Sequence, residues 1–168
     1  MASTSTQIVS SSSSLTPSWT YDAFLSFYGE DTRKSFTDHL HTALKQKGIR
    51  VFRDNEKLKR GKYISNELLK AIQESMYAIA VISPNYAFSK WCLIELAKIV
   101  ECMRDTRLTV LPIFYHVDPS HIRNQMETFA EAFDRHEKDP KVDVVEMQKW
   151  RGALKEVGSI SGWHVHDR

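Results

Sequence analysis

Five short apolar runs are spaced along the chain, and each of them is predicted to be a strand. They cover residues 21–27, 49–52, 77–82, 109–115 and 162–165. The third run is apolar throughout, which is typical of a strand buried on both faces of a parallel sheet. Pro112 lies within the fourth run, and this indicates either a position near the edge of the sheet or a local irregularity.

Segments with apolar residues at helical spacing lie between these runs. A first helix of about fifteen residues is expected after Glu30-Asp31-Thr32, and Gly48 ends it. The face that it turns to the core holds Phe36, Leu40, Ala43 and Leu44. Further helices are expected over residues 64–72, after Ser89, from the turn at 117–120, around 129–133, and over 143–157, where the apolar positions are Val145, Trp150, Leu154 and Val157.

A strand followed by a helix, repeated along the chain, requires right-handed crossovers. The fold class is therefore α/β, with a five-stranded parallel sheet and helices on both of its faces. The order 2-1-3-4-5 is the simplest arrangement. In that order the loops after Phe27 and Ile82 meet at the switch point of the sheet, where proteins of this class bind ligands.

The helix after Ser89 carries one carboxylate close to this switch point. Its core-facing stripe consists of residues 92, 93, 96, 99, 100 and 103, and Ser89 occupies the position of an N-cap. Trp91 and Glu95 lie one turn apart on the neighbouring line, at the edge of the stripe. Spacing alone leaves two interpretations open: Glu95 contacts a ligand in the crevice, or it is a rim residue paired with Lys98.

Composition sets limits on the class of protein. The 168 residues are 42% hydrophobic and 26% charged, which is enough for one globular domain. A net charge of +2 offers no broad field for nucleic acid or for a membrane surface, so neither is expected as a partner. Cys92 and Cys102 are separated by about 15 Å along one predicted helix, beyond the reach of a disulfide. We therefore expect a reduced, intracellular protein of the cytoplasm or the nucleus.

Residues 1–18 differ from the rest of the chain. They contain no charge and little to bury, which predicts a disordered leader rich in Ser and Thr. A basic start and an apolar centre, the marks of a secretory signal, are missing, and the lack of Arg or Lys before Arg33 argues against a transit peptide. Residues 19–168 form the predicted domain.

Motifs for several common chemistries are missing. The sequence has no P-loop, no dinucleotide fingerprint and no nucleophile elbow. The histidine pairs 39 and 41, 116 and 121, and 164 and 166 lack companions at zinc-ligand spacing, so no metal site is predicted. Cys92 lies on the core stripe, which favours a buried thiol over a nucleophile. The basic loop at 53–62 stands beside the predicted crevice, where it could hold an anion or a partner chain.

Six blocks of this sequence, in this order, resemble a plant Toll/interleukin-1 receptor (TIR) domain of the kind found at the front of nucleotide-binding leucine-rich-repeat immune receptors. Among them are Ser-Phe-Tyr-Gly-Glu-Asp-Thr-Arg, which ends the first block, and Ser-Lys-Trp-Cys-Leu-Ile-Glu-Leu. The blocks lie at residues 21–33, 36–40, 52–54 with 58–61, 89–96, 112–120 and 161–164. The resemblance implies a flavodoxin-like fold for residues 19–168, without the C-terminal helix that closes it in other members.

The resemblance also implies an activity: many members hydrolyse NAD⁺ when they self-associate. Glu95 falls on the catalytic glutamate of the family. Positions that line the nucleotide pocket correspond to Phe27, Gly29, Ser89 and Trp91, with Tyr28 at its mouth. Self-association surfaces correspond to Asp38 and His39 on the first helix and to Arg60, Gly61 and Lys62 in the basic loop. NAD⁺ is then a substrate, with no permanently bound cofactor. The expected partners are other TIR domains and downstream immune-signalling proteins.

Tyr28 stands where the family usually has arginine, and a tyrosine cannot reproduce a bidentate cationic donor. Two hypotheses remain. In the first, the domain self-associates and cleaves NAD⁺ with Glu95; in the second, it is a weak or inactive module that associates with active relatives. A phosphate-accepting receiver domain is excluded, because Ser26-Phe27 and Ser83-Pro84 stand where that class needs acids.

Overall fold

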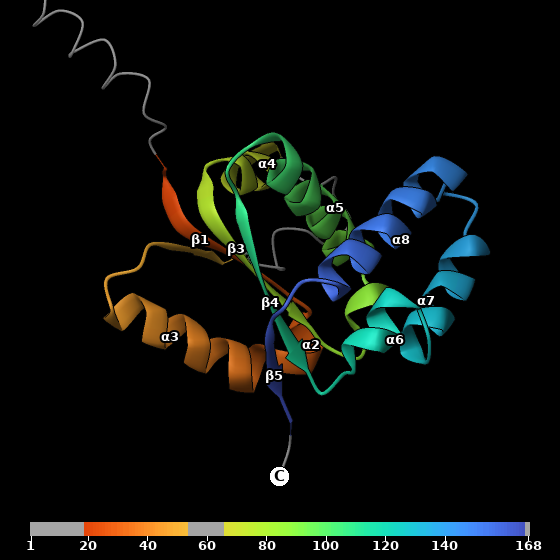
Figure 1. Ribbon diagram of the computed structural model, residues 1–168, viewed down its shortest axis with the longest axis horizontal. Coiled ribbons are helices and arrows are strands. Elements are labelled where there is room, and N and C mark those ends of the chain that lie inside the picture. Colours follow the sequence, from red (N-terminus) through yellow and green to blue (C-terminus); the bar gives the residue numbers. More distant parts are fainter. Residues whose placement is uncertain (1–18, 54–65, 167–168) are drawn as a thin grey trace, which may run out of the picture.

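The computed structural model describes residues 19–53 and 66–166. Their centre is a parallel sheet in the order β2-β1-β3-β4-β5, which confirms the predicted α/β fold and strand order (Figure 1). The predicted leader at 1–18 and the predicted association residues Arg60, Gly61 and Lys62 lie outside the described residues. The strands are β1 (Tyr21–Phe27), β2 (Val51–Arg53), β3 (Ser75–Ile82), β4 (Thr109–Tyr115) and β5 (Trp163–Val165).

The inner strands are long and the outer ones short. β3 pairs with both β1 and β4, and its last residues are buried on both faces, as its unbroken apolar run predicted. β2 begins two residues later than expected, at Val51. β5 pairs with β4 only from Ile113 to Tyr115. Pro112 therefore lies on the strand next to the edge strand, one residue before this pairing begins. The amide hydrogen that proline lacks interrupts no described hydrogen bond to β5.

Helices cover both faces of the sheet (Figure 1). On one face Phe36 of η1 and two leucines of α3, Leu40 and Leu44, pack onto a small core around Leu25 and Val81. The larger core lies on the opposite face, where α4, α5 and α8 pack. The helical segments are α2 (Gly29–Thr32), η1 (Arg33–Thr37), α3 (Asp38–Gln46), α4 (Asn66–Gln73), η3 (Tyr86–Phe88), α5 (Lys90–Asp105), α6 (Pro119–Arg123), α7 (Thr128–Glu137) and α8 (Val144–Gly158).

The first predicted helix is not continuous. A π-helical turn, η1, separates α2 from α3. Across this turn the hydroxyl of Thr37, the last residue of η1, donates to the hydroxyl of Thr32, the last residue of α2, at 2.6 Å, and both side chains are buried. These threonines are five residues apart, the spacing of a π turn, so their bond favours the wider turn over a regular α-helix.

Two predicted core residues are exposed. Val145 is 62% exposed, whereas Trp150, Leu154 and Val157 are buried as expected. The buried stripe of α8 begins at Met147, and Val145 lies off that line. Ala43 is also exposed, because the line through Leu40 and Leu44 faces the sheet and Ala43 lies to its side.

Candidate functional site

The loops that follow β1 and β3 meet at the carboxyl edge of the sheet, as the strand order predicted. The Asp31 carboxylate in α2 accepts hydrogen bonds from the backbone amide of Asn85 at 2.9 Å and from its side-chain amide at 3.0 Å. These residues are 54 positions apart in the sequence. Charge-assisted bonds of this kind fix the two loops relative to each other.

The start of α5 is held against the end of β1. The Ser89 side-chain oxygen accepts a hydrogen bond from the Cys92 amide at 3.2 Å, so Ser89 is the N-cap that its position predicted. Cys92 is buried, and its thiol donates to the Phe27 carbonyl at 3.5 Å. Trp91 is half-buried. The helix therefore begins next to the junction of β1 and α2, where Phe27, Tyr28 and Gly29 lie.

Glu95 lies deeper than the sequence indicated. Its residue is only 2% exposed, and its Oε1 atom accepts a hydrogen bond from the Ser26 hydroxyl at 2.9 Å. Lys98 pairs with Glu101 at 3.6 Å. The interpretation of Glu95 as a rim residue is therefore wrong, because Glu95 is buried beside the core stripe. A buried carboxylate is costly without polar partners, and the hydrogen bond from Ser26 helps to accommodate Glu95.

Two hydroxyl groups form a chain of contacts that ends at this carboxylate. The Ser26 and Tyr86 oxygens lie 2.7 Å apart, and the Tyr86 hydroxyl donates to the Cys92 carbonyl at 3.1 Å. Both side chains are completely buried. Burial, followed by the nearby Cys92 and Glu95, raises the pKa of Tyr86 well above its usual 10, so the phenol stays neutral. Sequence analysis missed both residues, although Ser26 is the one hydroxyl within the apolar run at 23–27.

The residues at the end of β1 and directly after it make different contacts. Phe27 is buried, and the Arg53 guanidinium lies 5.4 Å from the centre of its ring. Gly29 is buried at the start of α2. Tyr28 is half-buried and its hydroxyl donates to the Glu30 carboxylate at 2.9 Å. Burial, and then Glu30, raise the pKa of Tyr28 to about 12. Tyr28 therefore presents a neutral phenol at the position where the resemblance leads us to expect a cation.

The predicted association surface begins beside these residues. Asp38, at the start of α3, forms a 2.6 Å ion pair with Arg53, the same arginine that lies over Phe27. His39 is exposed. Asp38 thus has an internal partner that connects α3 to the end of β2, whereas His39 faces solvent.

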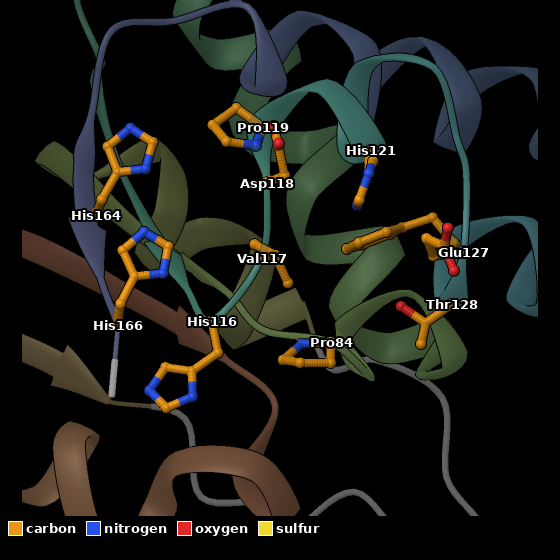
Figure 2. A pocket seen from close by; sticks show the side chains of 11 residues that line it. Pro84, His116, Val117, Asp118, Pro119, His121, Glu127, Thr128, His164 and His166 are labelled. Atoms are coloured by element: carbon orange, nitrogen blue, oxygen red, sulfur yellow. The ribbon is translucent and has the colours of Figure 1, made fainter. Parts of the chain in front are cut away.

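A separate cavity of about 550 Å³ opens at the same edge of the sheet. Figure 2 shows His164 and His166 on one side of it, and His121, Glu127 and Thr128 on the other. The remaining lining residues are Pro84, His116, Val117, Asp118, Pro119 and Phe129. No three His, Cys, Asp or Glu side chains among the described residues converge as metal ligands. A groove of about 970 Å³ lies between α5 and α8, and Glu95 lines neither space.

Comparison with known proteins decides the family. A model of the TIR domain matches residues 20–168. The chain belongs to the TIR domain family. The TMV resistance protein N of Nicotiana glutinosa is 56% identical to this TIR domain over 151 residues, which cover 90% of this chain and 13% of that protein. Disease resistance protein RPV1 of Vitis rotundifolia is 56% identical over 171 residues, which cover 99% of this chain and 12% of that protein.

The chain therefore spans 12–13% of the length of these two plant relatives. A solved structure supports the same assignment. The TIR domains of the activated Roq1 resistosome, which directly recognizes the pathogen effector XopQ, match with a TM-score of 0.78 and 51% identity, over 87% of this chain and 88% of that one. No helix in residues 19–53 and 66–166 combines the length and apolar character needed to cross a membrane.

Proposed function

We propose that this TIR domain associates with other TIR domains in plant immune signalling and then cleaves NAD⁺ to nicotinamide and ADP-ribose, with Glu95 as the catalytic carboxylate. The observation that carries the proposal is the position of Glu95. It lies one turn into the helix that Ser89 caps, and Ser26 at the end of β1 holds it at 2.9 Å, directly before Phe27 and Tyr28.

The chemistry suits a single carboxylate. When the bond between ribose C1′ and the pyridinium nitrogen breaks, its electron pair neutralises the nicotinamide ring, so no general acid is needed. An ionised Glu95 stabilises the oxocarbenium-like transition state. Water then forms the new bond to C1′, and its proton passes to the carboxylate and on to solvent. Trp91, one turn before Glu95, offers an aromatic face to the substrate.

Association is part of the proposal, because Glu95 is 2% exposed in the single chain. NAD⁺ reaches it only after the surrounding groups have moved. We assign this rearrangement to contacts through Asp38 and His39 and through residues 60–62. The presence of similar TIR domains in an activated resistosome supports a role for assembly. NAD⁺ is a substrate here, and downstream immune-signalling proteins are the proposed receivers of its products.

A second candidate is an interaction module with little or no turnover, which associates with active TIR domains. Tyr28 favours it, because its hydroxyl is engaged by Glu30 and it brings no positive charge to the substrate phosphates. This candidate predicts salt-sensitive binding to a related TIR domain that charge reversal at Arg60 or Lys62 abolishes.

The experiment that separates the two candidates follows nicotinamide release from NAD⁺ over a range of protein concentrations and with a crowding agent. The proposal predicts turnover that rises more steeply than the protein concentration and is absent in Glu95→Ala. Silence of both the wild type and Tyr28→Arg under crowding rejects the catalytic function and leaves the interaction module.

A further inference from the structure

We propose that Ser26 and Tyr86 are positioning residues for Glu95, and that their hydroxyls form a reversible hydrogen-bond chain that accommodates the carboxyl group in both its charged and its neutral form. This inference rests on the proposed function, because it assigns the two residues to the same reaction. Neither residue needs to touch the substrate, because both act through the Glu95 carboxylate.

The hydroxyl protons of this cluster are fewer than its contacts. Three short contacts connect four oxygen atoms: Glu95 to Ser26 at 2.9 Å, Ser26 to Tyr86 at 2.7 Å, and Tyr86 to the Cys92 carbonyl at 3.1 Å. Each hydroxyl has one proton to donate. The two hydroxyls can therefore fill two of the three contacts while Glu95 is ionised.

With Glu95 ionised, the favourable direction is from Tyr86 to Ser26 and from Ser26 to the carboxylate. Both dipoles then point their positive ends toward the negative charge. The single Tyr86 proton leaves the longer contact, the Cys92 carbonyl at 3.1 Å, for the Ser26 oxygen at 2.7 Å. This arrangement stabilises the form of Glu95 that the first step of the reaction needs.

With Glu95 protonated, the chain reverses. The carboxyl group donates to Ser26, Ser26 donates to Tyr86, and Tyr86 donates to the Cys92 carbonyl. All three contacts are then filled. The same oxygen positions thus serve the state in which Glu95 has taken the proton of the attacking water, without movement of a heavy atom. Because buried polar groups are costly when unsatisfied, this limits the cost of the charge change.

The groups that titrate in the described contacts of this cluster are few. Tyr86 from η3 stays neutral, since its pKa is raised well above 10 by burial. Cys92 from α5 is buried and contacts the Phe27 carbonyl. Ser26, which β1 contributes, does not titrate in the working range.

Ser83 provides a matched control. Like Ser26, it is completely buried at the carboxyl end of a central strand, but its hydroxyl has no hydrogen-bond partner in the described part of the chain. Ser83→Ala therefore removes a buried hydroxyl without touching the cluster. Ser26→Ala and Tyr86→Phe each remove one member with little change in shape, and Ser26→Thr restores a hydroxyl.

The first readout is kinetic. We expect kcat for nicotinamide release to fall about tenfold or more in Ser26→Ala and by a smaller factor in Tyr86→Phe, with KM within about twofold of wild type. Ser26→Thr should recover most of the loss, and Ser83→Ala should match the wild type. A purely structural role for these hydroxyls would instead reduce thermal stability and leave kcat per folded molecule unchanged.

The second readout does not depend on activity. Glutamate labelled with ¹³C at the carboxyl carbon reports the titration of Glu95, whose resonance is assigned by its loss in Glu95→Gln. The midpoint should move to higher pH in Ser26→Ala and, to a smaller extent, in Tyr86→Phe, because a donor to the charged form is lost. It should not move in Ser83→Ala.

The kinetic and the titration measurements separate the positioning role of Ser26 and Tyr86 from the proposed cleavage of NAD⁺. A midpoint that moves in a chain that does not cleave NAD⁺ supports the positioning role and rejects the proposed function. A midpoint that stays in place in both Ser26→Ala and Tyr86→Phe overturns the positioning role, whether or not the wild type is active. If Ser26→Ala does not fold, Tyr86→Phe alone decides.

Discussion

The carboxylate of Asp31 accepts two hydrogen bonds from Asn85, one from its backbone amide and one from its side chain, and these bonds join the loops after β1 and β3. Asp31→Ala leaves both donors without this acceptor in a partly buried setting. We expect the free energy of unfolding to fall by about 1.5–3 kcal/mol. Urea denaturation measures this loss, and a change below about 0.5 kcal/mol would mean that the two loops are held together by other contacts.

Tyr28→Arg tests the most conspicuous departure from the family pattern. An arginine at the mouth of the pocket can donate two hydrogen bonds to a phosphate, and we expect KM for NAD⁺ to fall about tenfold, equivalent to about 1.4 kcal/mol. Tyr28→Phe is the control. It should leave KM close to that of the wild type, because the Tyr28 hydroxyl is already engaged by Glu30. Equal KM values for all three proteins would remove Tyr28 from the substrate site.

Asp38 and His39 are adjacent in sequence but should respond differently to substitution. His39 is exposed, so His39→Ala should weaken self-association, measured by sedimentation, without lowering the melting temperature. Asp38→Ala also breaks the ion pair with Arg53, which lies over the Phe27 ring. Because this pair is partly exposed, we expect a loss of about 0.2–1 kcal/mol in the free energy of unfolding.

If neither substitution alters sedimentation at concentrations where the wild type associates, this face of α3 does not take part in assembly. If Asp38→Ala alone alters sedimentation, its effect on self-association passes through Arg53 and the end of β2 rather than through direct contact with the partner domain.

The ion pair between Lys90 and Asp139 predicts a dependence of stability on pH. It joins the first turn of α5 to the segment after α7. Lys90, and then the Lys141 amide, hold the pKa of Asp139 below its ordinary value of 3.8. A carboxylate whose pKa is lowered by folding contributes its stability above the unfolded value and loses it as the pH falls through the folded one.

Asp139→Asn should therefore be less stable than the wild type at pH 7, and the difference should close as the pH falls below 3.8. Urea midpoints measured at a series of pH values test this. A difference that stays constant down to the lowest pH would show that the charge of Asp139 contributes nothing.

Much of the architecture could be predicted, because it depends on patterns that act locally. The unbroken run at 77–82 predicted a central strand, and the stripe through Leu93 and Leu96 predicted the buried face of α5. The position of Ser89 just before this stripe predicted the N-cap of α5. The repeat of strand and helix then predicted a parallel sheet, for which 2-1-3-4-5 was the simplest strand order.

What could not be predicted depends on contacts between distant parts of the chain. Glu95 lies next to the core stripe, and spacing cannot tell whether such a residue faces solvent or a hydroxyl 69 positions earlier in the sequence. The π turn depends on a bond between two threonine side chains, which leaves no mark in the apolar pattern. Val145 is exposed because Met147, two residues later, begins the buried face of α8.

The most direct test of the account compares nicotinamide release by the wild type and by Glu95→Gln at the same high protein concentration. The amide oxygen of Gln can still accept the Ser26 hydrogen bond, so folding should be preserved while the negative charge is lost. The account predicts that the wild type releases nicotinamide and that Glu95→Gln, with an unchanged melting temperature, loses at least about two orders of magnitude in rate. Equal rates in the two proteins would contradict it.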